Sequence, residues 1–128
     1  MRLLLDTQVL LWAVAASRRL PKDARRVIED PENEVFYSAA SLWEIAIKSG
    51  LRRRDFRIDL EAFEAALPRT GLTELPVRAR HAVALSRLPS VHRDPFDRML
   101  VAQAVCEPLV LLTNDRVLTG YPAPVRLV

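Results

Sequence analysis

The sequence predicts an α/β fold with a mainly parallel sheet, because short apolar segments alternate with longer segments of helical spacing. The apolar segments are too short for helices and lack alternating polar residues, which is typical of strands covered on both faces. Strands that alternate with helices form βαβ units, whose sheets are parallel. No repeat, low-complexity segment or linker interrupts the pattern, so we expect a single domain over residues 1–128.

The elements follow one another in a regular order along the chain. Strands are expected over residues 2–5, 35–38, 72–75, 109–112 and 125–128, and helices over 7–16, 21–30, 41–50, 60–67, 78–88 and 95–106. Ser41 with Glu44 three residues later predicts a capping box at the start of one helix. Asp94 before Pro95 predicts an N-cap followed by proline in the first turn of the most regular helix.

The composition is typical of an ordinary globular protein, and its net charge permits binding to nucleic acid. Half of the residues are hydrophobic, 27% are charged, and the net charge of +3 is mildly basic. Cys106 is the only cysteine, which excludes an intramolecular disulfide and a zinc knuckle. Asp6 interrupts the apolar start at once, so we expect no signal peptide, no membrane span and a cytoplasmic location.

Four acidic residues stand where the predicted strands end or helices begin, namely Asp6, Glu44, Asp97 and Asp115. In open parallel sheets, sites form at the carboxyl ends of the strands, so these side chains are expected to converge. Carboxylates are poor core residues and good ligands for hard divalent cations. Four like charges would repel one another unless a cation neutralised them, which predicts a metal site.

Four short motifs, in order along almost the whole chain, resemble the PIN-domain ribonucleases, specifically the VapC-type toxins of bacterial toxin–antitoxin pairs. They are Leu4-Leu5-Asp6-Thr7, the segment from Ser41 to Lys48, His92-Arg93-Asp94-Pro95-Phe96-Asp97-Arg98 with Ala102-Gln103-Ala104 behind it, and Leu112-Thr113-Asn114-Asp115. The resemblance implies a three-layer α/β/α sandwich with a central, mainly parallel sheet of four to five strands. It also assigns the family's acidic quartet to Asp6, Glu44, Asp97 and Asp115.

The chemistry that the resemblance implies is metal-dependent hydrolysis of RNA phosphodiester bonds. The carboxylates would hold Mg²⁺ or Mn²⁺, which lowers the pKa of a bound water and polarises a phosphoryl oxygen. Asp6 and Asp97 are the expected direct ligands, Glu44 binds a second metal or positions the water, and Asp115 acts through water. Supporting roles fall to Thr7, Thr113, Asp94 and Arg98, with Arg98 either pairing with an acid or contacting substrate phosphate.

The resemblance implies partners as well as chemistry. A VapB-type antitoxin is expected to wrap the chain and to supply any DNA binding. A homodimer is expected, to which apolar positions near Trp12 and Trp43 contribute.

Two other classes of function stay open beside the ribonuclease. A PIN fold that has lost catalysis and only binds RNA or a partner is disfavoured, because all four acids are present. A phospho-receiver domain or an aspartate phosphatase is a poorer match. The phosphatase requires two aspartates one residue apart, whereas Thr7 and Gln8 follow Asp6.

Each acid also has a purely structural interpretation. Asp6 can cap a helix, Glu44 can pair with Lys48 four residues on, and Asp97 can complement a helix dipole. Asp115 can be a turn residue and is the weakest of the four.

For the other conspicuous residues, a structural role is favoured over a functional one. His92 is favoured as a loop residue over a metal ligand, and Trp12 and Trp43 are favoured as core or interface over base-stacking platforms. His81 carries no signal. The arginines at 52, 53, 54 and 57 are weighed between a solvated connection and a contact with phosphate.

Overall fold

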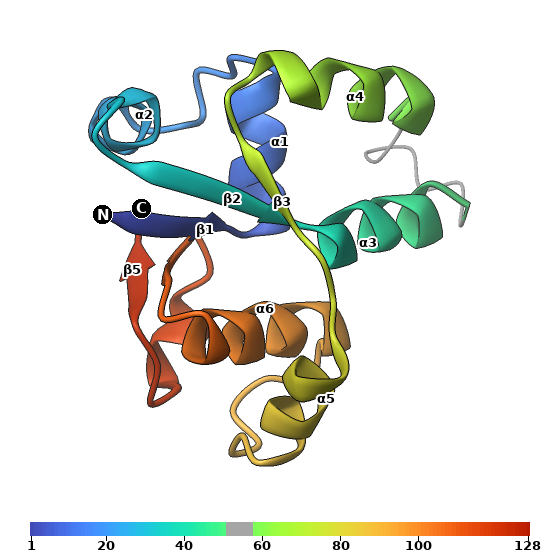
Figure 1. Ribbon diagram of the computed structural model, residues 1–128, viewed down its shortest axis with the longest axis vertical. Coiled ribbons are helices and arrows are strands. Elements are labelled where there is room, and N and C mark those ends of the chain that lie inside the picture. Colours follow the sequence, from blue (N-terminus) through green and yellow to red (C-terminus); the bar gives the residue numbers. More distant parts are fainter. Residues whose placement is uncertain (51–57) are drawn as a thin grey trace.

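The computed structural model describes residues 1–50 and 58–128 and contains a five-stranded sheet in which all neighbouring strands are parallel (Figure 1). The strands are β1 (Arg2–Leu5), β2 (Glu34–Ser38), β3 (Thr73–Leu75), β4 (Val110–Thr113) and β5 (Val125–Leu127). Their order in the sheet is β3-β2-β1-β4-β5, so β1 lies at the centre between β2 and β4. The predicted α/β class and parallel sheet are therefore confirmed.

Helices cover both faces of the sheet and give the predicted three layers. They are α1 (Thr7–Val14), α2 (Lys22–Glu29), α3 (Ala39–Gly50), α4 (Leu60–Ala66), α5 (Ala79–Ser86) and α6 (Pro95–Cys106), with short 3-10 turns over Leu67–Arg69 and Arg116–Gly120. Figure 1 shows α1, α2 and α4 on one side of the sheet, α5 and α6 on the other, and α3 extending beyond the end of β2. None of the described helices is long and apolar enough to cross a bilayer.

The central strand divides the hydrophobic core into two halves. Leu3 and Leu5 point to the side of α1 and α2, whereas Leu4 points to the side of α6, because successive side chains of a strand alternate between faces. All three leucines are completely buried. Burial of a leucine side chain contributes about 2 kcal/mol, so the apolar run both forms β1 and anchors the two helical layers to it.

Helix α3 begins two residues earlier than the sequence predicts. The hydroxyl of Ser38, not that of Ser41, accepts the first free backbone N–H, from Ala40 at 3.0 Å. The predicted capping box of Ser41 and Glu44 is therefore wrong, because both residues already lie inside the helix and their side chains turn to other partners. The arginines at 52, 53, 54 and 57 lie outside the described residues.

Candidate metal centre

Five carboxylates converge on one pocket of about 140 Å³ at the carboxyl end of the sheet. Asp6 follows β1, Asp115 follows β4, Glu44 lies on α3, and Asp94 and Asp97 lie at the start of α6. The four acids that the sequence singled out are thus brought together, with Asp94 beside them. The pocket is lined by Asp6, Thr7, Gln8, Leu11, Glu44, Lys48, Asp94, Asp97, Asn114 and Asp115.

The parallel pairing of β1 with β4 explains why Asp6 and Asp115 meet. Leu5 pairs with Leu112 in the sheet, and the backbone N–H of Asp6 donates to the Leu112 carbonyl at 2.9 Å. Two neighbouring strands therefore end at the same level, and the acids that follow them face one another across the strand ends.

Asp6 is held by hydrogen bonds to both of its carboxylate oxygens. Oδ1 accepts the backbone N–H of Val9 at 2.8 Å, which caps α1, and Oδ2 accepts the Thr113 hydroxyl at 2.5 Å. Only 4% of Asp6 is exposed, and burial raises its pKa to about 6 in spite of these hydrogen bonds. A carboxylate can accept about four hydrogen bonds, and Val9, Thr113 and the backbone N–H of Asn114 supply three of them, which leaves one acceptor position for a cation.

Thr113 connects Asp6 to Asp115. Its hydroxyl donates to Asp6 and accepts the backbone N–H of Asp115 at 3.0 Å. A single buried side chain thereby orients one acid and the backbone of the next.

Glu44 is buried and has a partner at each oxygen. The Thr7 hydroxyl donates to Oε1 at 2.6 Å, and the Lys48 ammonium forms an ion pair with Oε2. Burial lowers the pKa of Lys48, but hydrogen bonding and attraction to Glu44, followed by the charges of Asp94 and Asp97, outweigh burial and raise it. The ammonium group of Lys48 thus places a positive charge at the rim of the acidic pocket. The sequence analysis did not assign Lys48 to the site.

The pKa of Asp97 is raised further than that of Asp6. Burial, and then the negative charges of Asp94, Glu44 and Asp6, raise its pKa to about 7. Asp94 is the N-cap of α6, as predicted, because its Oδ1 accepts the backbone N–H groups of Phe96 and Asp97. The second oxygen of Asp94 makes none of these capping bonds.

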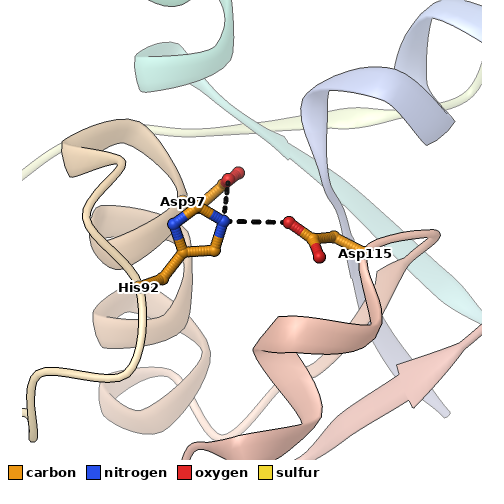
Figure 2. A group of neighbouring side chains, drawn as sticks. All are labelled: His92, Asp97 and Asp115. Atoms are coloured by element: carbon orange, nitrogen blue, oxygen red, sulfur yellow. Dashed lines mark hydrogen bonds and ion pairs between the residues drawn. The ribbon is translucent and has the colours of Figure 1, made fainter.

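Asp115 combines the two interpretations that the sequence left open. Its Oδ1 accepts the backbone N–H of Val117 at 3.0 Å, so it does cap a turn. Its Oδ2 lies 2.9 Å from Nε2 of His92, and the same nitrogen lies 3.5 Å from Oδ2 of Asp97 (Figure 2). His92 therefore joins the site, which the sequence analysis missed because only its place two residues before the N-cap could have indicated it.

Arg98 contacts neither an acid nor the pocket among the described residues. Its guanidinium donates to the carbonyls of Pro89 and Leu85 and, at 3.2 Å, to the Tyr121 hydroxyl. The predicted pairing of Arg98 with an acid is not seen, since the carbonyls of Leu85 in α5 and of Pro89 in the following loop occupy its donors. Its position indicates support for the loop that carries His92.

The two tryptophans differ in their surroundings. Trp12 packs partly buried against the core between α1 and the sheet. Trp43 is 62% exposed, and its ring meets that of Phe96 edge to face at 5.0 Å between centroids. Trp43 and Phe96 each precede a site acid, so this contact braces α3 against α6 where Glu44 and Asp97 face each other.

The sequence matches the PIN domain family over residues 3–123. The chain belongs to the PIN domain family. No curated protein matches it. The chain resembles the VapBC2 complex of Rickettsia felis, bound to a promoter DNA fragment, at 15% identity and a TM-score of 0.72, over 100% of this chain and 99% of that one.

Two further solved structures show the same fold. A DNA-bound VapBC from Salmonella typhimurium has 17% identity and a TM-score of 0.67 over 100% of this chain and 97% of that one. A toxin–antitoxin complex from Klebsiella pneumoniae has 20% identity and a TM-score of 0.65, over 97% and 95%. At such low identities the TM-scores establish a shared fold alone, and family membership supports a nuclease in general terms.

The donor set of this PIN domain fits a hard divalent cation. Oxygen atoms from Asp6, Glu44, Asp97 and Asp115 are the ligand type that Mg²⁺ and Mn²⁺ prefer. Burial raises the pKa of both Asp6 and Asp97, and repulsion from neighbouring carboxylates adds to it, so a bound cation would stabilise their charged forms. PIN nucleases use divalent metals, and beside the acidic pocket His92, Asp97 and Asp115 bring possible ligand atoms within 4.8 Å of one another.

Proposed function

We propose that residues 1–128 form a single-domain, metal-dependent endoribonuclease that acts as the toxin of a VapBC-type toxin–antitoxin pair. The observation that carries the proposal is the convergence of five carboxylates in one small pocket at the strand ends of a PIN domain. Mg²⁺ or Mn²⁺ bound there would supply Lewis-acid stabilisation and an activated water for attack on an RNA phosphodiester.

The acids of the pocket would have different roles in binding metal and positioning water. Asp6 and Asp97 are the proposed direct ligands, because burial and neighbouring carboxylates raise their pKa values and a bound cation would offset that cost. Glu44 would hold a second metal or orient the water, with Thr7 fixing its Oε1. Asp115 would act through water.

Three side chains would support this arrangement. Thr113 orients Asp6 and the backbone of Asp115, and Asp94 adds negative charge while capping α6. The Lys48 ammonium at the rim would attract a phosphate of the substrate.

The proposed partners follow from the structural relatives. Those relatives are VapBC and toxin–antitoxin complexes, two of them bound to DNA, which supports a VapB-type antitoxin that carries the DNA contacts. We also propose a homodimer and a cytoplasmic location.

The decisive experiment incubates the purified chain with total cellular RNA and Mn²⁺ or Mg²⁺, beside EDTA and a single-stranded DNA substrate. Asp6→Asn and Asp97→Asn should each lower cleavage by about a thousand-fold or more, because each removes a charged ligand. Asp23→Asn is the matched control, since Asp23 lies on α2 with 90% of its side chain exposed.

Circular dichroism should show that all three variants are folded. Intact RNA in the presence of a folded, metal-binding wild-type chain would favour a catalytically inactive binding module. Cleavage of DNA but not RNA would contradict the proposed substrate.

A further inference from the structure

The imidazole of His92 reaches between two of the site acids, Asp97 and Asp115 (Figure 2). It lies in the loop before α6, outside the four acids assigned to the site. Its Nε2 lies 2.9 Å from Asp115 Oδ2 and 3.5 Å from Asp97 Oδ2. One ligand atom from each of the three residues can be chosen so that all lie within 4.8 Å of one another. The imidazole is therefore either a metal ligand or a donor that orients its neighbours.

The hydrogen bond made by Nδ1, the other ring nitrogen of His92, distinguishes between these two roles. Nδ1 of His92 accepts the backbone N–H of Asp94 at 3.0 Å, so Nδ1 carries no proton. The proton of the neutral ring is then on Nε2, where it points at Asp115. Ligation through Nε2 would move that proton to Nδ1, where it would face the N–H of Asp94 and break this hydrogen bond.

The loop holds the ring in this orientation from the backbone side. The backbone N–H of His92 donates to the Tyr121 hydroxyl at 2.9 Å, and Arg98 donates to the same hydroxyl and to the Pro89 carbonyl. Tyr121 is buried, with 4% of its surface exposed. The imidazole thus sits on a loop that is tied to two separate elements.

We infer that His92 is a positioning residue that donates its Nε2–H to Asp115 and holds this carboxylate beside Asp97 for the metal. The inference rests on the proposed function only for the metal, whereas the donor role concerns the metal-free chain. Hydrogen-bonding partners of ligating carboxylates commonly change metal affinity by about 10- to 100-fold when they are removed.

The protonation of the ring can be observed directly, because the chain has two histidines in all. Long-range ¹H–¹⁵N spectra of the imidazoles, assigned with His92→Gln, should show a proton on Nε2 of His92 and none on Nδ1. Saturating Mg²⁺, which is diamagnetic, should leave the Nε2 proton in place. A proton on Nδ1, or loss of the Nε2 proton when Mg²⁺ binds, would overturn the inference.

Two substitutions of His92 test the roles of Nδ1 and Nε2 separately, with metal affinity as the measurement. His92→Asn keeps an oxygen that can accept the Asp94 N–H, as in an Asx turn, but loses the donor to Asp115. His92→Gln places an amide N–H near the position of Nε2. Isothermal titration with Mn²⁺ should show affinity lowered about tenfold in His92→Asn and within about threefold of wild type in His92→Gln.

His81→Gln is the matched control, since it alters the other histidine, whose Nε2 contacts Glu107 instead of a site acid. It should leave Mn²⁺ affinity unchanged. Equal affinities in His92→Asn and wild type would overturn the inference alone, and so would equal losses in His92→Asn and His92→Gln. A folded wild-type chain that binds no Mn²⁺ would instead overturn the proposed function and the metal role of His92, while the proton on Nε2 would still report the donor role.

Discussion

His81 and His92 make the same pair of contacts in two regions of the molecule with opposite electrostatic results. In each ring, Nδ1 accepts a nearby backbone N–H, from Arg78 at 2.9 Å and from Asp94 at 3.0 Å respectively. In each, Nε2 meets a carboxylate, at 2.7 Å for Glu107 and 2.9 Å for Asp115. These two contacts alone therefore do not distinguish the histidines.

The balance of charge does distinguish them. At Glu107, His81 and the guanidinium of Arg80 both face one carboxylate, and their hydrogen bonds lower the pKa of Glu107. At His92, one imidazole faces Asp97 and Asp115 beside a pocket lined by five acids, and burial, followed by the negative charges of its neighbours, raises the pKa of Asp97. A cluster whose positive and negative charges match stabilises the fold, whereas a cluster with an excess of negative charge is typical of a functional site that binds a cation.

The largest expected effect comes from Asp97→Asn, which removes charge from the unbalanced cluster. Mn²⁺ affinity should fall by about a hundred-fold or more, because a charged ligand is lost. Metal-free stability at pH 8 should rise by at least about 1 kcal/mol, since a buried carboxylate among like charges is removed. Isothermal titration and urea unfolding measure the two effects. Lower metal-free stability would show that Asp97 is a structural residue like Glu107.

A smaller effect is expected from pH on the metal-free wild-type chain. The folded pKa values of Asp6 and Asp97, about 6 and about 7, lie above their unfolded values of 3.8. The folded chain therefore binds these protons more tightly than the unfolded chain does. Stability should fall by about one to a few kcal/mol as pH rises from about 4, near the unfolded pKa, to about 7, near the folded pKa of Asp97.

Urea unfolding at a series of pH values in EDTA tests this expectation. Asp97→Asn should flatten the slope, and saturating Mn²⁺ at pH 8 should restore stability by mass action. A slope of the opposite sign would mean that the acids are already neutralised within the chain.

The smallest effect is expected at the balanced cluster. Glu107→Gln removes the charge that pairs with Arg80 and His81, and it should lower the free energy of unfolding by about 1–2 kcal/mol. Mn²⁺ affinity and RNA cleavage should not change, because Glu107 lies at the far end of α6 from Asp97. Urea unfolding beside a Mn²⁺ titration checks both statements. A change in Mn²⁺ affinity would show that the two clusters are coupled through α6.

The sequence predicted the sheet and the convergence of the acids because both depend on short-range patterns. The runs around Leu4 and Leu111 can only be buried strands, and parallel pairing then brings Asp6 and Asp115 to one edge. The start of α3 was misplaced, since the hydroxyls of Ser38 and Ser41 are equally good caps in sequence.

The sequence could not separate capping from function, because the same side chains do both. Asp6, Asp94 and Asp115 each cap a helix or a turn with one oxygen while lining the pocket. The roles of His92 and Lys48 depend on which carboxylate lies opposite, and only tertiary packing decides that. Arg98 is the opposite case, since its neighbour in sequence is a site acid but its partners are two backbone carbonyls and the Tyr121 hydroxyl.

The strand order has a consequence for the timing of synthesis on the ribosome. β4 lies beside β1 in the sheet, yet more than a hundred residues separate Arg2 from Val110 along the chain. Asp6 and Glu44 emerge early, whereas Asp97 and Asp115 emerge late. A nascent chain can therefore pair β1 with β2 but cannot assemble the acid pocket until residue 115 has been added. A chain that is interrupted before residue 97 carries only Asp6 and Glu44, and one that is interrupted between residues 97 and 115 still lacks the fourth acid.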